Sequence, residues 1–112
     1  MKPVLLDTGV IVALLDSSEK THRVCAEAIH AAAAPLITCE AVIAESCYLL
    51  RNFPGAPEAI IDNVLAGIFQ IPLQISKEAA AIKQILRKYR DRKIDLADAC
   101  LIHLADLKPR IY

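Results

Sequence analysis

Three carboxylates stand among apolar neighbours that give them no local partner. Asp7 ends the apolar run 3–6, and Glu45 has no charged residue three or four positions away in either direction. Asp98 is followed at those spacings by apolar residues and is preceded by Asp95 three positions earlier. Burying a carboxylate is costly unless a cation or a hydrogen-bond donor meets it. Since the apolar segments that carry these acids must pack together, we expect Asp7, Glu45 and Asp98 to converge on one site.

A cluster of this kind would contain only oxygen ligands, with no histidine or cysteine nearby. Such a set suits Mg²⁺ or Mn²⁺, which prefer carboxylates and keep several waters. One or two ions held there can generate a nucleophilic hydroxide and stabilise the leaving oxygen of a phosphodiester. Thr8, next to Asp7, could orient a carboxylate or a metal-bound water.

Each acid also has a simpler structural explanation. Asp7 could cap a short helix that begins at Thr8 or Gly9. Asp95 could cap the last helix, with Asp98 facing the positive end of its dipole. Glu45 could be a boundary residue that reaches solvent. The sequence leaves these alternatives open.

Composition restricts the class of protein. The chain has 112 residues, enough for one domain spanning 1–112; hydrophobic content is 55% and mean hydropathy is +0.40, too apolar for a disordered chain. We expect a soluble cytoplasmic protein without a membrane segment, since no apolar run is long enough to cross a bilayer. The four cysteines form no C-x-x-C pair, which favours buried thiols over disulfides or a zinc site. Five aromatic residues argue against a base-stacking platform of the single-strand-binding kind, which needs clustered aromatic faces.

A net charge of zero conceals an asymmetry along the sequence. Residues 1–76 carry eight acids and four bases, and residues 77–112 carry five acids and nine bases. Six of those bases fall between Lys83 and Lys93, opposed only by Asp91. Such a stretch is either a solvated helix face or a patch that contacts phosphates. In the second case the contacts would come from Arg87, Arg90, Arg92 and Lys93.

Short apolar runs alternate with helical patterns along the chain. We expect strands at 3–6, 35–38 and 71–75 and the start of a fourth at 110–112. We expect helices at 10–15, 19–33, 40–50, 57–69, 77–90 and 94–107, with Ser76 capping the fifth. This alternation predicts an α/β domain with a short, mainly parallel sheet covered by helices on both faces. Ligands of open sheets bind beyond the carboxyl ends of the strands, where Asp7 lies.

Three segments in order resemble the PIN-domain family, and most of all its small VapC-type toxins of toxin–antitoxin pairs. They are residues 5–15 (LLDTGVIVALL), 37–45 (ITCEAVIAE) and 94–102 (IDLADACLI). The resemblance implies a PIN-like three-layer α/β/α domain that cleaves single-stranded RNA with Mg²⁺ or Mn²⁺. It assigns the family's acids to Asp7, Glu45 and Asp98, with Asp95 and Thr8 as auxiliary residues.

The same resemblance implies partners and one departure. VapC-type toxins form homodimers and are inhibited by a cognate antitoxin protein. Family members continue past the fourth strand into a Thr-x-Asp-like segment that adds another acid, whereas this sequence stops at Arg110–Tyr112. We therefore expect a domain that lacks its last segment. The alternative function is a catalytically impaired PIN-like module that binds RNA or a protein.

Two other enzyme classes fit less well. Residues 5–9 (LLDTG) also match the motif of a dimeric aspartic protease, but that fold is all-β and rich in glycine, whereas this chain has three glycines and helical patterns. A phosphotransfer domain with Asp7 as nucleophile usually needs an acid at position 9, which is glycine here.

Overall fold

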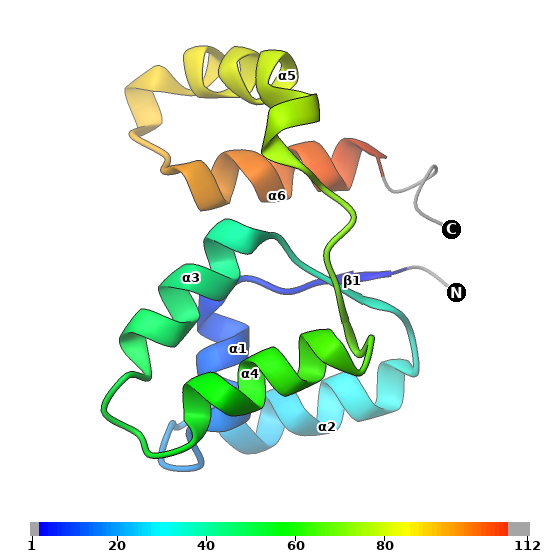
Figure 1. Cartoon of the computed structure of the whole chain (residues 1–112), viewed down its shortest axis with the longest axis vertical. Helices are drawn as coiled ribbons and strands as arrows, with labels where there is room; N and C mark the ends of the chain where they lie inside the picture. The colour runs from blue at the N-terminus through cyan, green and yellow to red at the C-terminus, as the bar shows by residue number, and fades with distance from the viewer. Residues whose placement is uncertain (1–2, 108–112) are drawn as a thin grey trace.

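The fold comes from a computed structural model, which describes residues 3–107. Within these residues the sheet has three parallel strands in the order β1 (Val4–Leu5), β2 (Leu36–Ile37) and β3 (Phe69–Gln70). The helices that follow β3 in the chain lie on one side of the strands, and the helices that precede β3 lie on the other (Figure 1). This arrangement confirms the predicted three-layer α/β/α fold. The fourth strand expected at 110–112 lies outside the described residues.

Between residues 3 and 107, six α-helices occur where helical patterns were expected, with different ends. They are α1 (Thr8–Leu15), α2 (His22–Ala32), α3 (Glu40–Leu49), α4 (Ala56–Leu65), α5 (Ile75–Lys88) and α6 (Leu96–Leu107), and a 3₁₀ turn covers Arg90–Arg92. The fifth helix starts after Gln74, so the prediction that Ser76 caps it is wrong. Within residues 3–107 no helix combines the length and apolarity that a membrane crossing would need.

The third strand lies earlier in the chain than predicted. Leu36 pairs with Phe69 and Ile37 with Gln70, so the strand precedes the expected run 71–75. The cause is an earlier end of α4: Gly67 has φ +78°, a left-handed conformation that stops the helix. Pro72 also lacks the N–H that a continued strand would donate.

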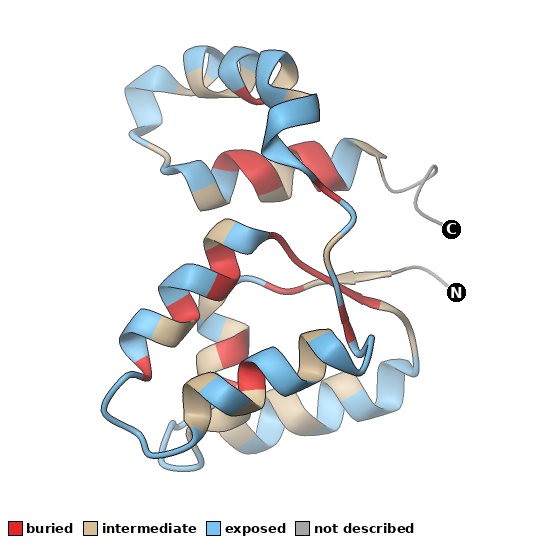
Figure 2. Cartoon of the chain, viewed as in Figure 1, coloured by how far each residue is buried: buried red, intermediate tan, exposed pale blue. Residues whose placement is uncertain are grey.

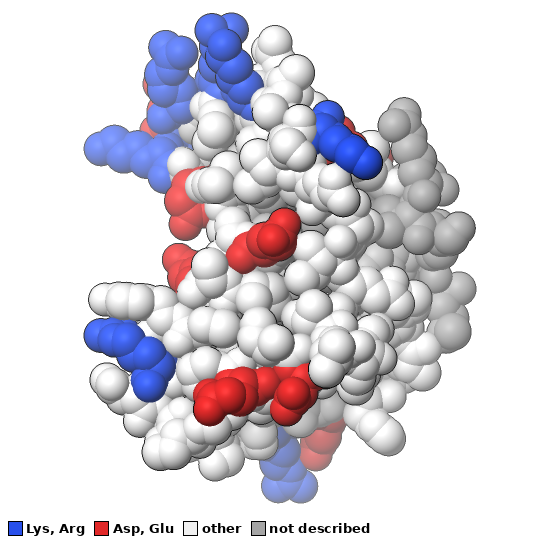
Figure 3. All heavy atoms as spheres, in the orientation of Figure 1, with Lys and Arg blue, Asp and Glu red and all other residues white. Residues whose placement is uncertain are grey.

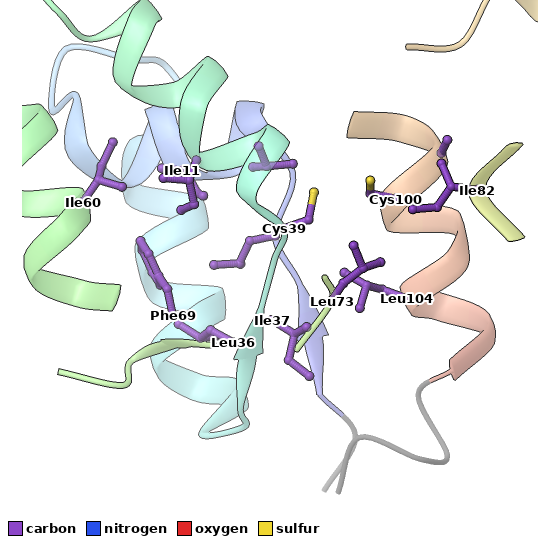
Figure 4. Close-up of a cluster of buried hydrophobic side chains, with 14 of the residues drawn as sticks. Ile11, Leu36, Ile37, Cys39, Ile60, Phe69, Leu73, Ile82, Cys100 and Leu104 are labelled. Atoms are coloured by element: carbon purple, nitrogen blue, oxygen red, sulfur yellow. The ribbon is translucent and has the colours of Figure 1, made fainter. Parts of the chain in front are cut away.

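The core lies on both faces of the sheet. Leu36 and Ile37 point to opposite faces, as successive strand residues must. Leu36 lies beside Phe69 on the α1–α4 side, and Ile37 lies toward Leu104 of α6 (Figure 4). Buried residues lie in β2, at Phe69 of β3 and on the inner faces of α3 and α6, whereas β1 and α2 contain no buried residue (Figure 2).

Two polar contacts each join neighbouring segments within one layer. Thr38 is buried, and its hydroxyl donates to the carbonyl of Leu6 at 2.9 Å, which ties the end of β2 to the residue before Asp7. Nε2 of the buried His103 lies 3.1 Å from Oε2 of Glu78 and connects α6 with α5.

Candidate active site

A pocket of about 160 Å³ opens beyond the carboxyl end of β1. Residues from the start of α1, from α3 and from the first turns of α6 enclose it. Its lining consists of Asp7, Thr8, Gly9, Val42, Glu45, Ala97, Asp98 and Leu101. Three segments distant in the sequence therefore bring Asp7, Glu45 and Asp98 to the same pocket.

Asp7 is placed by the transition from β1 to α1. It has extended backbone angles at the N-cap of α1, and its Oδ1 accepts a hydrogen bond from the backbone N–H of Val10 at 2.9 Å. The capping role considered from the sequence is therefore present. It occupies one carboxylate oxygen and fixes the direction of the side chain.

Glu45 is placed by α3 and held by a neighbour from α1. The hydroxyl of Thr8 donates to Oε1 of Glu45 at 2.5 Å. Glu45 is exposed, as in the alternative that it reaches solvent, and it also lines the pocket. Because the side chain reaches solvent at the pocket, it carries little burial cost.

Asp98 and Asp95 form a reciprocal cap at the start of α6. The N–H of Asp98 donates to Oδ1 of Asp95 at 2.8 Å, and the N–H of Asp95 donates to Oδ2 of Asp98 at 3.2 Å. This is the arrangement of a capping box with aspartate at both positions. Asp98 lines the pocket, whereas Asp95 does not.

The carboxylates of the pocket have no cationic partner among residues 3–107. The salt bridges of this region are Arg23 with Glu27 and His103 with Glu78, both away from the pocket. Three negative side chains facing one cavity repel each other unless a cation lies among them. The pocket therefore favours a bound cation.

The carboxylate and hydroxyl oxygens of the pocket fit a hard divalent ion, although the three carboxylates do not form a compact cluster. Within the described residues, no three His, Cys, Asp or Glu side chains lie close enough to hold an ion jointly. Mg²⁺ commonly binds through one or two carboxylates and keeps several waters, so it does not need a closed cage. Oxygen donors, together with room for water, match that mode of binding.

Comparison with known proteins gives the family. Residues 4–108 match the model of the PIN domain. The chain belongs to the PIN-domain family. Over 105 residues it is 30% identical to a protein named Ribonuclease VapC26 from Mycobacterium tuberculosis (strain ATCC 25618 / H37Rv). The aligned region covers 92% of this chain and 78% of that protein.

Four apolar or small residues of this PIN-domain pocket were not singled out from the sequence. They are Gly9, Val42, Ala97 and Leu101. Val42 and Leu101 lie three residues from Glu45 and Asp98, on the same helix faces as those acids. That spacing could have identified them once the acids were assumed to meet.

Two buried thiols lie near each other in this PIN domain. Cys39 precedes α3 and Cys100 belongs to α6. Burial raises the pKa of the Cys39 thiol, and burial together with the neighbouring Cys39 raises the pKa of Cys100 to about 11. Burial also raises the pKa of Cys47. These thiols are therefore protonated at neutral pH, as expected for packing residues.

The basic stretch lies beside the acidic pocket rather than in it. Arg87 belongs to the last turn of α5, Arg90 and Arg92 to the 3₁₀ turn, and Lys93 follows with a left-handed φ of 51°. All are exposed and lead directly into Asp95. Basic side chains gather over the α5 end of the molecule, above a hollow that contains acidic side chains (Figure 3).

Proposed function

We propose that this PIN domain is an endoribonuclease that hydrolyses phosphodiester bonds of single-stranded RNA with Mg²⁺ or Mn²⁺. One observation carries the proposal: Asp7, Glu45 and Asp98 line one pocket, and among residues 3–107 no basic side chain neutralises them. The similarity to a protein named as a ribonuclease supports RNA as the substrate.

Asp7, Glu45 and Asp98 would hold the ion partly through its bound waters, and each has one oxygen fixed by the protein. Val10 N–H engages Asp7, the Thr8 hydroxyl engages Glu45, and Asp95 N–H engages Asp98. These bonds orient the side chains before a ligand arrives. Asp95 is an auxiliary acid whose main contribution is to position Asp98.

The bound ion would supply a water of lowered pKa and charge stabilisation for the leaving oxygen. In the hydrolysis, the water oxygen bonds to phosphorus, one phosphorus–oxygen ester bond breaks, and the leaving oxygen takes a proton. Arg87, Arg90, Arg92 and Lys93 would contact RNA phosphates next to the pocket, because exposed bases beside an acidic site favour the approach of a polyanion.

The same proposal extends to the biological role. By its similarity to a VapC protein, the chain would act in the cytoplasm as the toxin of a type II toxin–antitoxin pair. It would form a homodimer and be inhibited by a cognate antitoxin protein. Induced expression should then arrest bacterial growth, and substitution of Asp98 by asparagine should relieve the arrest.

Cleavage of single-stranded RNA in Mn²⁺, Mg²⁺ or EDTA tests the activity. We expect cleavage that requires either ion and falls by at least about 100-fold in Asp98→Asn, because the substitution removes a metal-binding charge. Asparagine keeps an oxygen that can accept from Asp95 N–H, so the cap of α6 persists.

Two control variants separate the roles of the acids. Asp95→Asn keeps a capping side chain and should retain most activity. Asp62→Asn removes an exposed acid of α4 outside the pocket and should behave as the wild type. If the wild-type chain cleaves no RNA with either ion, the nuclease is excluded and the impaired binding module takes its place. Cleavage that survives fully in Asp98→Asn would exclude Asp98 from the site.

A further inference from the structure

An exposed tyrosine and an arginine form a stacked pair at the end of α3. The guanidinium carbon of Arg51 lies 4.0 Å from the centre of the Tyr48 ring, a cation–π contact. Nη1 of Arg51 also donates to the backbone carbonyl of Tyr48 at 2.8 Å, which holds the guanidinium in place. Tyr48 nevertheless remains 62% exposed, so much of its surface is open to solvent.

This pair adjoins the acidic pocket. Tyr48 follows Glu45 by three residues, and side chains at that spacing share one face of a helix. Glu45 lines the pocket, and Tyr48 lies one helical turn further along α3. The pair therefore extends the pocket wall away from Asp98 and the basic stretch.

Arg51 is an isolated positive charge in an acidic part of the chain. It is the only Lys or Arg between Arg23 and Lys77, and none of the described carboxylates lies within 4.0 Å of it. Basic side chains lie on both sides of the acidic hollow, over α5 and at the end of α3 (Figure 3). A polyanion crossing the hollow would thus meet positive charge before and after the acids.

We propose that Tyr48 and Arg51 form a nucleotide subsite for single-stranded RNA, in which one base stacks on the exposed part of the Tyr48 ring and Arg51 contacts the adjoining phosphate. The proposal rests on the ribonuclease function. It adds a second RNA contact, on the α3 side of the pocket. A single ring binds a single base, so the scarcity of aromatic residues does not oppose it. Duplex RNA keeps its bases stacked inside and would gain nothing from this subsite.

A protein surface is the competing occupant, because Leu49 and Phe53 are also exposed nearby. RNA is favoured by the guanidinium of Arg51, which contacts none of the described carboxylates, by the adjacency of Glu45 and by the basic stretch across the hollow. A flat apolar interface would require none of these three features.

Anisotropy of a fluorescent single-stranded oligoribonucleotide in EDTA measures binding without cleavage. We expect Tyr48→Ala to weaken binding about 5- to 150-fold, the cost of losing one stacked base. Tyr48→Phe keeps the ring and should bind within about twofold of the wild type. Arg51→Ala should reduce the salt slope of log affinity by about 0.7, the value for one phosphate contact on a single strand.

Matched controls isolate the stack. Leu65→Ala truncates an 85% exposed side chain on α4 and should leave binding unchanged. In cleavage assays Tyr48→Ala should raise KM and leave kcat within about threefold. A base stacked away from the reacting atoms binds equally well in the ground state and in the transition state. Its melting temperature should stay within about 3 °C of the wild type, as for other surface substitutions.

Two results would overturn the subsite. The first is unchanged affinity of Tyr48→Ala for single-stranded RNA while the wild type binds and cleaves it. The second is a loss of affinity in Tyr48→Ala together with a lower molecular mass in light scattering than the wild type shows. Tyr48 would then lie in an interface between protein chains. If the wild type neither binds nor cleaves RNA, the ribonuclease proposal fails, and the subsite fails with it.

Discussion

At the scale of single residues, the structural and chemical explanations of the acids are compatible. Asp7, Glu45 and Asp98 each accept a hydrogen bond from the protein at one carboxylate oxygen. Within residues 3–107 no donor reaches the second oxygen of any of the three. Each acid can thus stabilise local structure and still offer an oxygen to a ligand in the pocket.

The contact between Thr8 and Glu45 yields a residue-scale prediction. Thr8→Val keeps the shape of the side chain and removes the hydroxyl that fixes Glu45. We expect Mn²⁺ affinity, measured by calorimetry, to fall about 10- to 100-fold, as when the partners of metal ligands are removed. Thr8→Ser restores the donor and should restore the affinity. Equal Mn²⁺ affinity for the wild type and Thr8→Val would exclude this role of Thr8.

The sequence predicted that the three acids share one site, but it did not predict how exposed each side chain is. Chain order and helical spacing were enough to bring Asp7, Glu45 and Asp98 together, because strand ends and helix starts converge at one edge of a parallel sheet. The sequence left open whether Glu45 is buried or reaches solvent. The outcome depends on how α3 packs against the other helices, and the spacing of apolar residues within one helix does not determine that packing.

At the scale of elements, boundaries were predicted less well than the elements themselves. The helix expected at 57–69 ends at Leu65, and the strand expected at 71–75 is replaced by Phe69–Gln70. Gly67 was the available signal, since a glycine just after a helix often takes the left-handed conformation. The register of β3 had no local signal, because it is set by pairing with Leu36 and Ile37.

The contact between α3 and α6 through Cys39 and Cys100 predicts a loss of stability in alkali. The folded pKa of Cys100 is about 11 against an ordinary value of 9.0, so the folded chain keeps this proton longer than the unfolded chain. This contribution is constant below pH 9, and the free energy of unfolding falls as pH rises from 9 to 11. The difference between the two pKa values corresponds to at most about 3 kcal/mol of the free energy of unfolding.

Urea unfolding measured at several pH values from about 8 to about 11 tests this fall in the free energy of unfolding, because that range spans the ordinary and the folded pKa of Cys100. The decline should be shallower in Cys100→Ala than in the wild type, whatever the stability of the variant at pH 8. Cys25→Ala, which removes a partly buried thiol elsewhere, should keep the wild-type slope. Parallel slopes for Cys100→Ala and the wild type would contradict the assignment.

At the scale of the whole molecule, charge is segregated along the chain and across its surface. The first 76 residues are net acidic and the remainder net basic, yet the total is zero. Acidic side chains in the hollow lie between basic ones over α5 and at the end of α3 (Figure 3). Zero net charge gives no general attraction to RNA, so binding must depend on the local patch.

Reversing part of the basic stretch tests this dependence. The double variant Arg87→Glu/Arg90→Glu should weaken single-stranded RNA binding, because two phosphate contacts become repulsions. The salt slope of log affinity should fall by about 1.4, the value for two contacts on a single strand. Lys20→Glu/Lys77→Glu makes the same change in net charge outside the stretch and should have a much smaller effect. Equal losses in the two double variants would mean that RNA responds to net charge, and the basic stretch would then have no specific part in binding.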